Sequence, residues 1–237
     1  FAPASGRQVW TLIDMFPGRP GMTVIGENGG IVMRDGVEVS SHPVDTPTVR
    51  EVIRLVREAT SGPDGIDGGL VMCGKQFAYV ERTDDRFVDG VMPYYHRTKR
   101  VDDQIAIIDG IEAGEIDDAI VKLAVYVIGP VQALAEATLA RFADTHQYAI
   151  SGANWADLQI RGVDKGSAVR DLQRFLGVDR SQTAVFGDAG NDLSMMSEGD
   201  LSFAMANASR DVVEASRFIA PSNNEAGVAQ VLRTLLG

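Results

Sequence analysis

The sequence predicts an α/β fold, in which a parallel sheet covered by helices is interrupted by a separate α+β layer. Between residues 184 and 236, short apolar runs alternate with helical patterns, which is typical of parallel strands buried on both faces. Between residues 70 and 150, strand-like runs mix with a helical pattern and indicate the second layer. A chain of 237 residues is long enough to form two compact domains.

The first 44 residues predict one helix and three strands. Residues 7–16 place apolar side chains at helical spacing, and Pro17 and Gly18 end the run. A short buried strand is expected at residues 22–25. Two further strands, at residues 31–33 and 37–39, flank Asp35 and Gly36, a dipeptide that favours a tight hairpin turn.

Residues 45–156 predict the inserted layer. Thr46 or Thr48 can cap a helix that has Pro47 near its first position. An apolar stripe follows at Val49, Val52, Ile53 and Val56. Strands are expected at residues 70–72, 77–80 and 121–127, and a helix at residues 131–143. Paired aspartates lie between them at residues 84–85, 102–103 and 117–118, and we interpret these pairs as solvated loops.

The C-terminal part alternates strands with helices. Strands are expected at residues 184–186, 201–205 and 218–220. Helices are expected at residues 169–176, 192–197, 209–215 and 225–236. Ser222 and Glu225 form a capping box before the last helix.

Composition excludes several classes of partner. With 22 Lys and Arg against 33 Asp and Glu the net charge is -11, and no basic run could neutralise a series of nucleic-acid phosphates. The most apolar stretch, residues 119–140, contains charged residues, Gly129 and Pro130 and falls short of a membrane span. Cys73 is the single cysteine, so no intramolecular disulfide can form, which fits a reducing cytoplasm. We expect a monomer or a homodimer.

Asp188 and Asp192 follow a predicted buried strand, where the ligands of an α/β sheet collect. Together with Asn191 they form a cluster of hard oxygen donors, which is the ligand chemistry of Mg²⁺. An acidic turn taken alone is as often structural as functional. The strand before it and the helix after it favour a metal site here.

Lys165 lies immediately before an amphipathic helix. A helix start attracts phosphate because its free N–H groups and its dipole favour negative charge, and a lysine adds a point charge. The alternative is a solvated lysine in a turn. Ser5, followed by Gly6 and Arg7, has the same form, and its hydroxyl could bind phosphate or simply cap the next helix.

Five side chains of the inserted layer could contact a substrate, although aromatic residues at such positions more often serve packing. They are Tyr94, Tyr95, His96, Arg97 and Trp155. The three histidines of the chain lack the spacing of metal ligands.

In this order, the motifs resemble those of the haloacid dehalogenase superfamily, and within it the Cof-type phosphatases that carry a large α/β cap. Residues 4–7 look like its second motif, residues 26–30 like its "ENGA" loop, residues 163–168 like its third motif and residues 187–192 like its fourth. Residues 203–208 look like its "AMGNA" segment. The resemblance implies a Rossmann-like core formed by residues 1–44 and 157–237, with a cap domain at residues 45–156.

The resemblance also implies a Mg²⁺-dependent phosphomonoesterase that acts through an aspartyl-phosphate. The substrate would be a sugar phosphate or a similar small phosphorylated metabolite. Asp188 would ligate Mg²⁺, and Lys165 would hold the nucleophile and the transferring phosphoryl group. Asp192 would either lie behind the metal ligands or orient Lys165. The phosphate-binding residues would be Ser5, Gly6, Asn191 and Lys165.

The first motif of that superfamily, Asp-x-Asp-Gly-Thr, does not occur in the sequence. Because this motif carries the nucleophile and precedes the second motif in the superfamily, we expect the nucleophile to lie upstream of Phe1. We therefore expect little or no activity from the 237 residues alone. Two alternatives remain: a phosphomutase, which also uses an aspartyl-phosphate, and a non-catalytic phosphate-binding protein that has lost its nucleophile.

Overall fold

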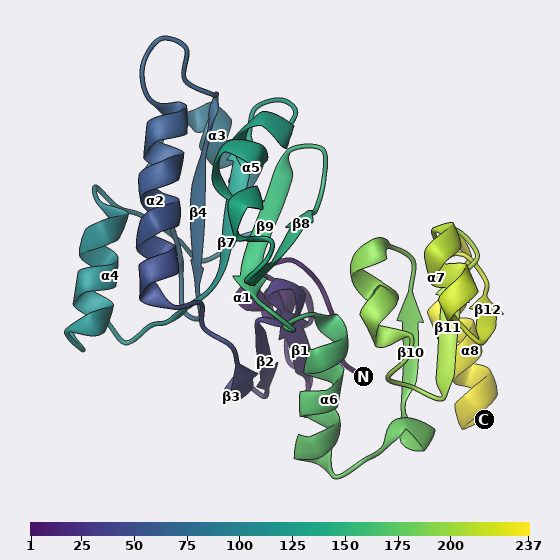
Figure 1. The fold of residues 1–237 in the computed structure, drawn as a ribbon. Helices are drawn as coiled ribbons and strands as arrows, with labels where there is room; N and C mark the ends of the chain where they lie inside the picture. The colour runs from purple at the N-terminus through teal and green to yellow at the C-terminus, as the bar shows by residue number, and fades with distance from the viewer. The chain divides into compact units, whose positions relative to one another are not determined.

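The computed structural model describes residues 1–237 and has an α/β fold made of two compact units, Phe1–Val163 and Asp164–Gly237 (Figure 1). The first unit contains two sheets and the second contains one. None of the helices is both long enough and apolar enough to cross a membrane.

The first unit begins with a short helix and an antiparallel sheet. Helix α1 (Val9–Met15) precedes strands β1 (Thr23–Gly26), β2 (Ile31–Arg34) and β3 (Val37–Ser41), which pair in chain order. The expected turn between β2 and β3 is confirmed, because Asp35 and Gly36 have φ values of 50° and 77°. Ahead of α1, Ala4 forms a parallel bridge to Ile25 of β1. The segment before α1 therefore lies alongside β1.

A six-stranded sheet forms the larger part of the first unit. Its strand order is β6-β5-β4-β7-β9-β8, and only β5 and β6 pair in parallel. The strands are β4 (Gly68–Gly74), β5 (Ala78–Val80), β6 (Thr98–Arg100), β7 (Ile120–Val127), β8 (His146–Ile150) and β9 (Trp155–Ile160). The predicted boundary of the inserted layer, at residue 156, falls within β9.

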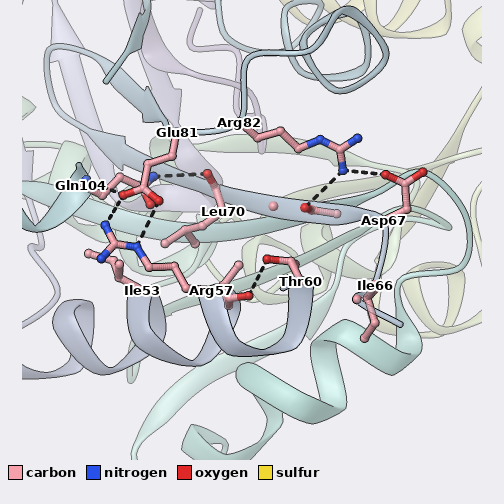
Figure 2. Close-up of a pocket in the computed structure, with 13 residues that line it drawn as sticks. Ile53, Arg57, Thr60, Ile66, Asp67, Leu70, Glu81, Arg82 and Gln104 are labelled. Carbon is pink, nitrogen blue, oxygen red and sulfur yellow. Dashed lines mark hydrogen bonds and ion pairs between the residues drawn. The ribbon is translucent and has the colours of Figure 1, made fainter. Parts of the chain in front are cut away.

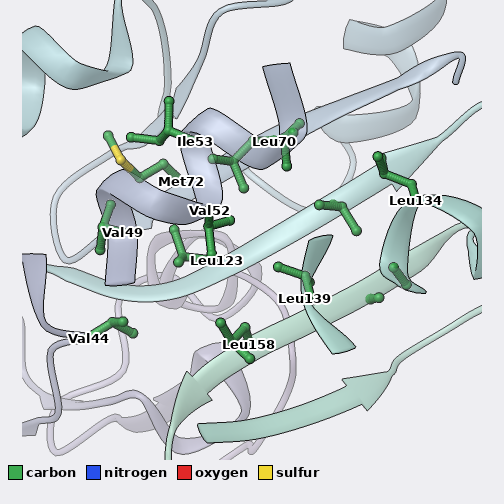
Figure 3. Packing of buried hydrophobic residues seen from close by; sticks show 14 of the residues in the cluster. Val44, Val49, Val52, Ile53, Leu70, Met72, Leu123, Leu134, Leu139 and Leu158 are labelled. Carbon is green, nitrogen blue, oxygen red and sulfur yellow. The ribbon is translucent and has the colours of Figure 1, made fainter. Parts of the chain in front are cut away.

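Three helices cover one face of this sheet: α2 (Thr46–Thr60), α4 (Gln104–Glu112) and α5 (Gln132–Thr138). Figure 3 shows Val52 and Ile53 of α2 packed with Leu70, Met72 and Leu123 of the strands. Each fully buried aliphatic side chain contributes about 1.5–3 kcal/mol. This cluster is therefore the main core of the first unit.

The opposite face of the sheet is covered in part by α3 (Asp85–Val91), whose Phe87 and Val91 pack with Val71 and Val80. Residues of one strand alternate between the two faces, so Leu123 and Val125 of β7 belong to the helix-covered core. Lys122, Ala124 and Tyr126 of β7 lie on the opposite face.

Aspartates begin the helices of the inserted layer. Asp45, rather than Thr46 or Thr48, caps α2, and its carboxylate accepts a hydrogen bond from the Thr48 N–H at 2.9 Å. Asp84 caps α3 and Asp103 caps α4 in the same way. A carboxylate at this position accepts a free N–H of the first turn and interacts favourably with the helix dipole.

The interpretation of the paired aspartates as solvated loops is right for the exposed pair at residues 102–103, but it missed α3, α4 and β6 in the same stretch. It also missed the burial of Asp118. The Tyr79 hydroxyl donates a hydrogen bond to Asp118 at 2.8 Å, and the backbone N–H groups of Gln76 and Phe77 donate to the same carboxylate. Asp118 thus anchors the turn between β4 and β5.

The second unit is a parallel sheet with helices between and after its strands. Strands β10 (Ala184–Gly187), β11 (Leu201–Met205) and β12 (Phe218–Ala220) pair in that order. The helices are α6 (Lys165–Leu176), α7 (Arg210–Ala215) and α8 (Gly227–Leu236). Phe186, Phe203 and Phe218 stack across the strands, with ring centroids 4.9 and 5.2 Å apart.

The predicted alternation of strands and helices in the second unit is confirmed, with two differences. The segment after β10 is a 3-10 helix, Gly190–Met195, rather than an α-helix. The capping box of Ser222 and Glu225 is present, but it closes a separate 3-10 turn, Asn223–Glu225, and α8 begins only at Gly227.

Candidate functional site

The acidic loop of the second unit is built around a buried ion pair. Lys165 Nζ lies 2.6 Å from Asp192 Oδ1, and the two side chains are 6% and 10% exposed. Asp192 Oδ2 accepts hydrogen bonds from the backbone N–H groups of Asp188, at 3.0 Å, and Ala189, at 3.2 Å. Asp192 therefore holds Lys165 and shapes the loop with the same carboxylate.

The local sequence explains why Lys165 is buried. Asp164 caps α6 through a capping box, so Lys165 is the first residue of the helix rather than part of a turn before it. Gly166 packs against the 3-10 helix Gly190–Met195, where a Cβ atom would lie 2.4 Å from a backbone carbonyl oxygen. This close approach brings Lys165 within reach of Asp192, and the alternative of a solvated lysine is wrong.

Asp188 is the carboxylate of this loop that stays open to a ligand. Its side chain is exposed, and one carboxylate oxygen lies 3.4 Å from Asn207 Nδ2. Asn191 is exposed on the same loop. No group of three His, Cys, Asp or Glu side chains in the protein could hold a metal ion by itself. Because Mg²⁺ is commonly held by one or two carboxylates together with water and substrate phosphate, Asp188 fits a partial Mg²⁺ site.

Ser5 and Gly6, in the first unit, form a turn beside β1. The Ser5 N–H donates to Ile25 O at 2.9 Å, and the Ser5 hydroxyl oxygen accepts a hydrogen bond from the Arg7 N–H at 3.2 Å. The residue that caps α1 is Gln8, so the interpretation of Ser5 as a helix cap is wrong. The Gly6 N–H has no hydrogen-bond partner in the protein. The turn therefore offers the Gly6 N–H and the Ser5 hydroxyl proton as donors.

A strained turn, Glu27–Gly29, holds this segment in place. Glu27, Asn28 and Gly29 have φ values of 52°, 51° and 100°. For the two residues with side chains, such a conformation costs on the order of 1–3 kcal/mol, so surrounding contacts must enforce it. The Glu27 N–H donates to Arg7 O at 2.9 Å, and the Asn28 N–H donates to Ser5 O at 3.0 Å.

A buried lysine connects the strained turn to the six-stranded sheet. Lys122 Nζ lies 2.5 Å from Glu27 Oε2, and both side chains are 1% exposed. Lys122 also donates a hydrogen bond to Gly6 O at 2.7 Å. Burial lowers the pKa of Lys122, but the nearby carboxylates of Glu27 and Asp157 outweigh burial and raise it above its ordinary value. Lys122 is therefore charged at neutral pH.

Two residues of β9 complete this contact. Gln159 Nε2 donates to Glu27 O at 2.7 Å, and Asn28 Nδ2 donates to Asp157 Oδ2 at 3.2 Å. The sequence analysis missed Lys122, Asp157 and Gln159 altogether. A signal was present in β9 alone, because Asp157 and Gln159 recur there at the two-residue period of one strand face, whereas Lys122 is the single charged residue of β7.

The predicted substrate-contacting aromatic residues pack against one another. The Trp155 ring centroid lies 5.5 Å from that of Tyr94, 5.9 Å from that of Tyr95 and 4.8 Å from that of Tyr126. Tyr95 is buried, whereas Tyr94 is 38% exposed. Of this group, Tyr94 and Trp155 keep part of their surface open.

His96 and Arg97 both contact α1. His96 Nδ1 lies 2.9 Å from Asp14 Oδ2, and the Arg97 guanidinium lies 3.5 Å from the ring centroid of Trp10. These contacts tie the segment before β6 to α1.

A pocket of about 500 Å³ lies between the C-terminal half of α2 and the N-terminal end of β4. Figure 2 shows that its guanidinium groups are already paired with carboxylates, Arg57 with Glu81 and Arg82 with Asp67. The pocket contains none of the residues that the sequence analysis selected. Because its charges are neutralised internally, it is a weaker candidate than the two loops.

Comparisons with known proteins agree with the motifs. The sequence profile of the haloacid dehalogenase-like hydrolases matches residues 1–232. The 5-amino-6-(5-phospho-D-ribitylamino)uracil phosphatase YbjI of Escherichia coli K12 is 34% identical over 245 aligned residues, which cover 100% of this chain and 83% of YbjI.

Solved structures share the fold. A haloacid dehalogenase-like hydrolase from Bacillus subtilis superposes with a TM-score of 0.79 at 17% identity, over 98% of this chain and 86% of that chain. The subclass IIB sugar phosphatase BT4131 superposes with a TM-score of 0.69 at 16% identity, over 99% of this chain and 84% of that chain. At these identities the likeness establishes the α/β fold alone.

Proposed function

Because this chain belongs to the haloacid dehalogenase-like hydrolase family, we propose that it serves the Mg²⁺-dependent hydrolysis of a small phosphomonoester. The observation that carries the proposal is the buried pair of Lys165 and Asp192 beside the exposed carboxylate of Asp188. A lysine fixed at a helix start supplies positive charge for a phosphate, and the open carboxylate supplies a hard oxygen ligand.

In this proposal, residues of both loops take part in phosphate binding, as the order of the family motifs implies. Lys165 holds the transferring group, and Asp192 fixes the direction of the Lys165 ammonium. The other phosphate contacts are Ser5, Gly6 and Asn191. The transition state of phosphoryl transfer spreads negative charge over the equatorial oxygens, so donors held in position before the reaction lower the barrier.

Asp188 is the residue that would hold Mg²⁺. The bound ion would neutralise part of the phosphate charge. Asp192 does not take this role, because both of its oxygens are engaged by Lys165 and by backbone N–H groups.

The reaction passes through an aspartyl-phosphate in this proposal and so needs a nucleophilic aspartate. Residues 1–237 contain no Asp-x-Asp-Gly sequence. In the acidic loop, Asp188 is assigned to the metal, and Asp192 is engaged by Lys165 and by backbone N–H groups. Asp157 of β9 is buried against Asn28. We therefore propose that these 237 residues bind phosphate but turn over little or no substrate on their own.

The relatives support a phosphorylated sugar or polyol as the substrate. YbjI is named as the phosphatase of a ribitylamino-uracil phosphate, and BT4131 is described as a sugar phosphatase. Tyr94 and Trp155 are the side chains that we propose to contact the organic part of the substrate. A cytoplasmic location and a monomeric or homodimeric state remain predictions from the sequence.

Phosphate release from p-nitrophenyl phosphate tests the proposed function. We expect none above background from residues 1–237, and Mg²⁺-dependent release once an N-terminal extension supplies an Asp-x-Asp-Gly-Thr strand. In the extended protein, Lys165→Ala lowers turnover about 10²–10³-fold, as expected for one lost charge-stabilising donor. Asp188→Asn weakens the dependence on Mg²⁺.

Unchanged kinetics in both variants would contradict the site assignment. Formation of an isomeric ester without phosphate release would favour a phosphomutase. An extended protein that binds phosphate without any turnover would favour the non-catalytic binding protein.

A further inference from the structure

Lys122 contacts the Ser5–Arg7 turn although it belongs to the six-stranded sheet. Its ammonium group contacts the Glu27 carboxylate at 2.5 Å, Gly6 O at 2.7 Å and the Tyr95 ring, with its centroid at 5.4 Å, and the Asp157 carboxylate is also near. A fully buried lysine carries a high desolvation cost, which is offset only when its partners are well placed. The partners of Lys122 include a backbone carbonyl of the proposed phosphate-binding turn.

The bond to Gly6 O fixes the direction of a whole peptide unit. A trans peptide is planar, so its carbonyl and its N–H point in opposite directions. Because Gly6 O points to Lys122, the Arg7 N–H points away from Lys122 and donates to the Ser5 hydroxyl oxygen at 3.2 Å. The Ser5 hydroxyl accepts this bond, which leaves its proton to donate to a different group.

Glycine at position 6 makes an external clamp necessary. A Cβ atom there would lie 3.0 Å from Asn28 Oδ1, so the close approach of Asn28 favours glycine. Glycine adopts many backbone conformations at similar cost and does not hold one by itself. Lys122 supplies the missing restraint, and Glu27 holds the Lys122 ammonium in place.

We propose that Lys122 is a positioning residue for phosphate binding. Through the Gly6 carbonyl it sets the direction of the Arg7 N–H, and the bond that this N–H donates leaves the Ser5 hydroxyl proton free for an oxygen of a phosphomonoester. This inference rests on the proposed function of Ser5 and Gly6 as phosphate contacts. Lys122 itself does not touch the phosphate.

The competing explanation is that the pair of Lys122 and Glu27 only anchors the strained turn to the sheet. Two variants separate these roles. Glu27→Gln removes the ion pair but leaves Lys122 able to donate to Gly6 O. The double variant Glu27→Gln with Lys122→Met buries no charge at either position, yet leaves Gly6 O without its donor.

Inorganic phosphate is the probe, titrated into the wild-type 237-residue chain and both variants with detection at the Gly6 and Arg7 amide signals by NMR. We expect Glu27→Gln to bind within about twofold of the wild type. The double variant should bind about tenfold more weakly, as for one lost hydrogen bond of a positioned donor. Equal affinity in all three proteins would overturn the proposal.

Hydrogen exchange tests, without phosphate, whether Lys122 orients the Gly6–Arg7 peptide. In the double variant, exchange of the Arg7 amide should accelerate at least tenfold while Leu123 and Val125 in the sheet keep their wild-type rates. No change at Arg7, or equal acceleration in the sheet, would show an anchoring role only. If the wild type bound no phosphate at Gly6, the proposed function of that turn would fail, while the exchange rates would still decide the role of Lys122.

A measurement on the wild type tests the contact between Lys122 and Gly6 even if the double variant does not fold. Slowly exchanging Lys122 ammonium protons with nuclear Overhauser contacts to the Gly6 Hα atoms are expected. Rapidly exchanging ammonium protons without such contacts would contradict the clamp.

Discussion

Lys165 and Asp192 are 27 positions apart in the sequence, yet their side chains form an ion pair. The same Asp192 carboxylate holds the Lys165 ammonium and shapes the acidic loop. The helix start at Lys165 and the acidic loop could each be read from the sequence. Their contact was expected only through the family resemblance, because local patterns do not show how closely α6 approaches the loop. Side-chain burial is set by tertiary packing, which a local pattern does not contain.

Lys165→Met should lower the free energy of unfolding by about 3–5 kcal/mol, because it leaves the Asp192 carboxylate buried without its partner. Urea unfolding at pH 7 measures the loss. Arg210→Met is a matched control in the same unit, since the Arg210 and Glu214 side chains are 88% and 59% exposed and such pairs contribute little. Equal stability of Lys165→Met and Arg210→Met would show that the pair does not hold the loop.

Lys122 was missed for a different reason. Lys122 is separated from Gly6 by 116 positions in the sequence. It is the single charged residue of an apolar strand, and such a residue gives no indication of its partner. Asp157 and Gln159 recur with strand periodicity and indicate a polar face. What that face contacts depends on the positions of β1 and the Glu27–Gly29 turn, which no spacing rule supplies.

At the scale of elements, the packing of α6 against the 3-10 helix Gly190–Met195 depends on Gly166. Helix propensity alone predicts that Gly166→Ala stabilises the helix by about 1 kcal/mol. The new Cβ atom would lie 2.4 Å from Ser194 O, a backbone atom that cannot move aside alone. Overpacking of this kind costs about 1–3 kcal/mol, and the displaced helix would also shift Lys165.

We therefore expect Gly166→Ala to destabilise the protein in urea by up to about 2 kcal/mol, which is the upper overpacking cost less the gain in helix propensity. Gly190→Ala is the control, because a Cβ atom at Gly190 meets nothing within 4 Å. A Gly166→Ala protein as stable as the wild type would mean that α6 and the 3-10 helix do not pack this closely.

The start of α2 predicts a pH effect. Partial burial opposes ionisation of Asp45, but hydrogen bonds from Thr48 outweigh it and lower the pKa of Asp45 below its ordinary value. The ionised form is thus bound more favourably in the folded state. Its contribution is complete above the ordinary pKa of 3.8 and is lost as the pH falls through the lower native value.

Asp45→Ala should cost about 1 kcal/mol at pH 7, the usual value of a lost helix cap. The difference between wild type and variant should shrink at a pH below the native pKa of Asp45. Asp45→Asn keeps a capping oxygen without the charge and should retain most of the stability at pH 7. A difference for Asp45→Ala that is the same at pH 7 and pH 2.5 would exclude the ionised cap.

Elements with strong local signals were predicted, and those decided by distant partners were not. The hairpin at Asp35 and Gly36 and the strands of the second unit follow from turn chemistry and apolar runs. Helices α3 and α4 are short and begin at aspartates within a polar stretch. Their capping aspartates therefore could not be distinguished from the other charged residues around them. Strand β6 has exposed basic residues and exists through its pairing with β5.

At the scale of the whole molecule, the two sets of groups that we propose to bind phosphate belong to two different compact units. The first set is Ser5 and Gly6, held by the strained turn and Lys122. The second is Lys165 and Asp188, held by Asp192. Family membership and the order of the motifs are the grounds on which we propose that both sets bind phosphate.

A joint NMR titration tests this account most directly. Residues 1–237 would be titrated with inorganic phosphate in the presence of Mg²⁺, following the amide signals of both sets. If both sets bind phosphate, the amide signals of Gly6 and Asp188 each shift with a saturable dependence on phosphate, and Asp188→Asn weakens the Mg²⁺-dependent response of its own loop. Saturable binding at one set with no response at the other, or no saturable binding at either, would contradict the account.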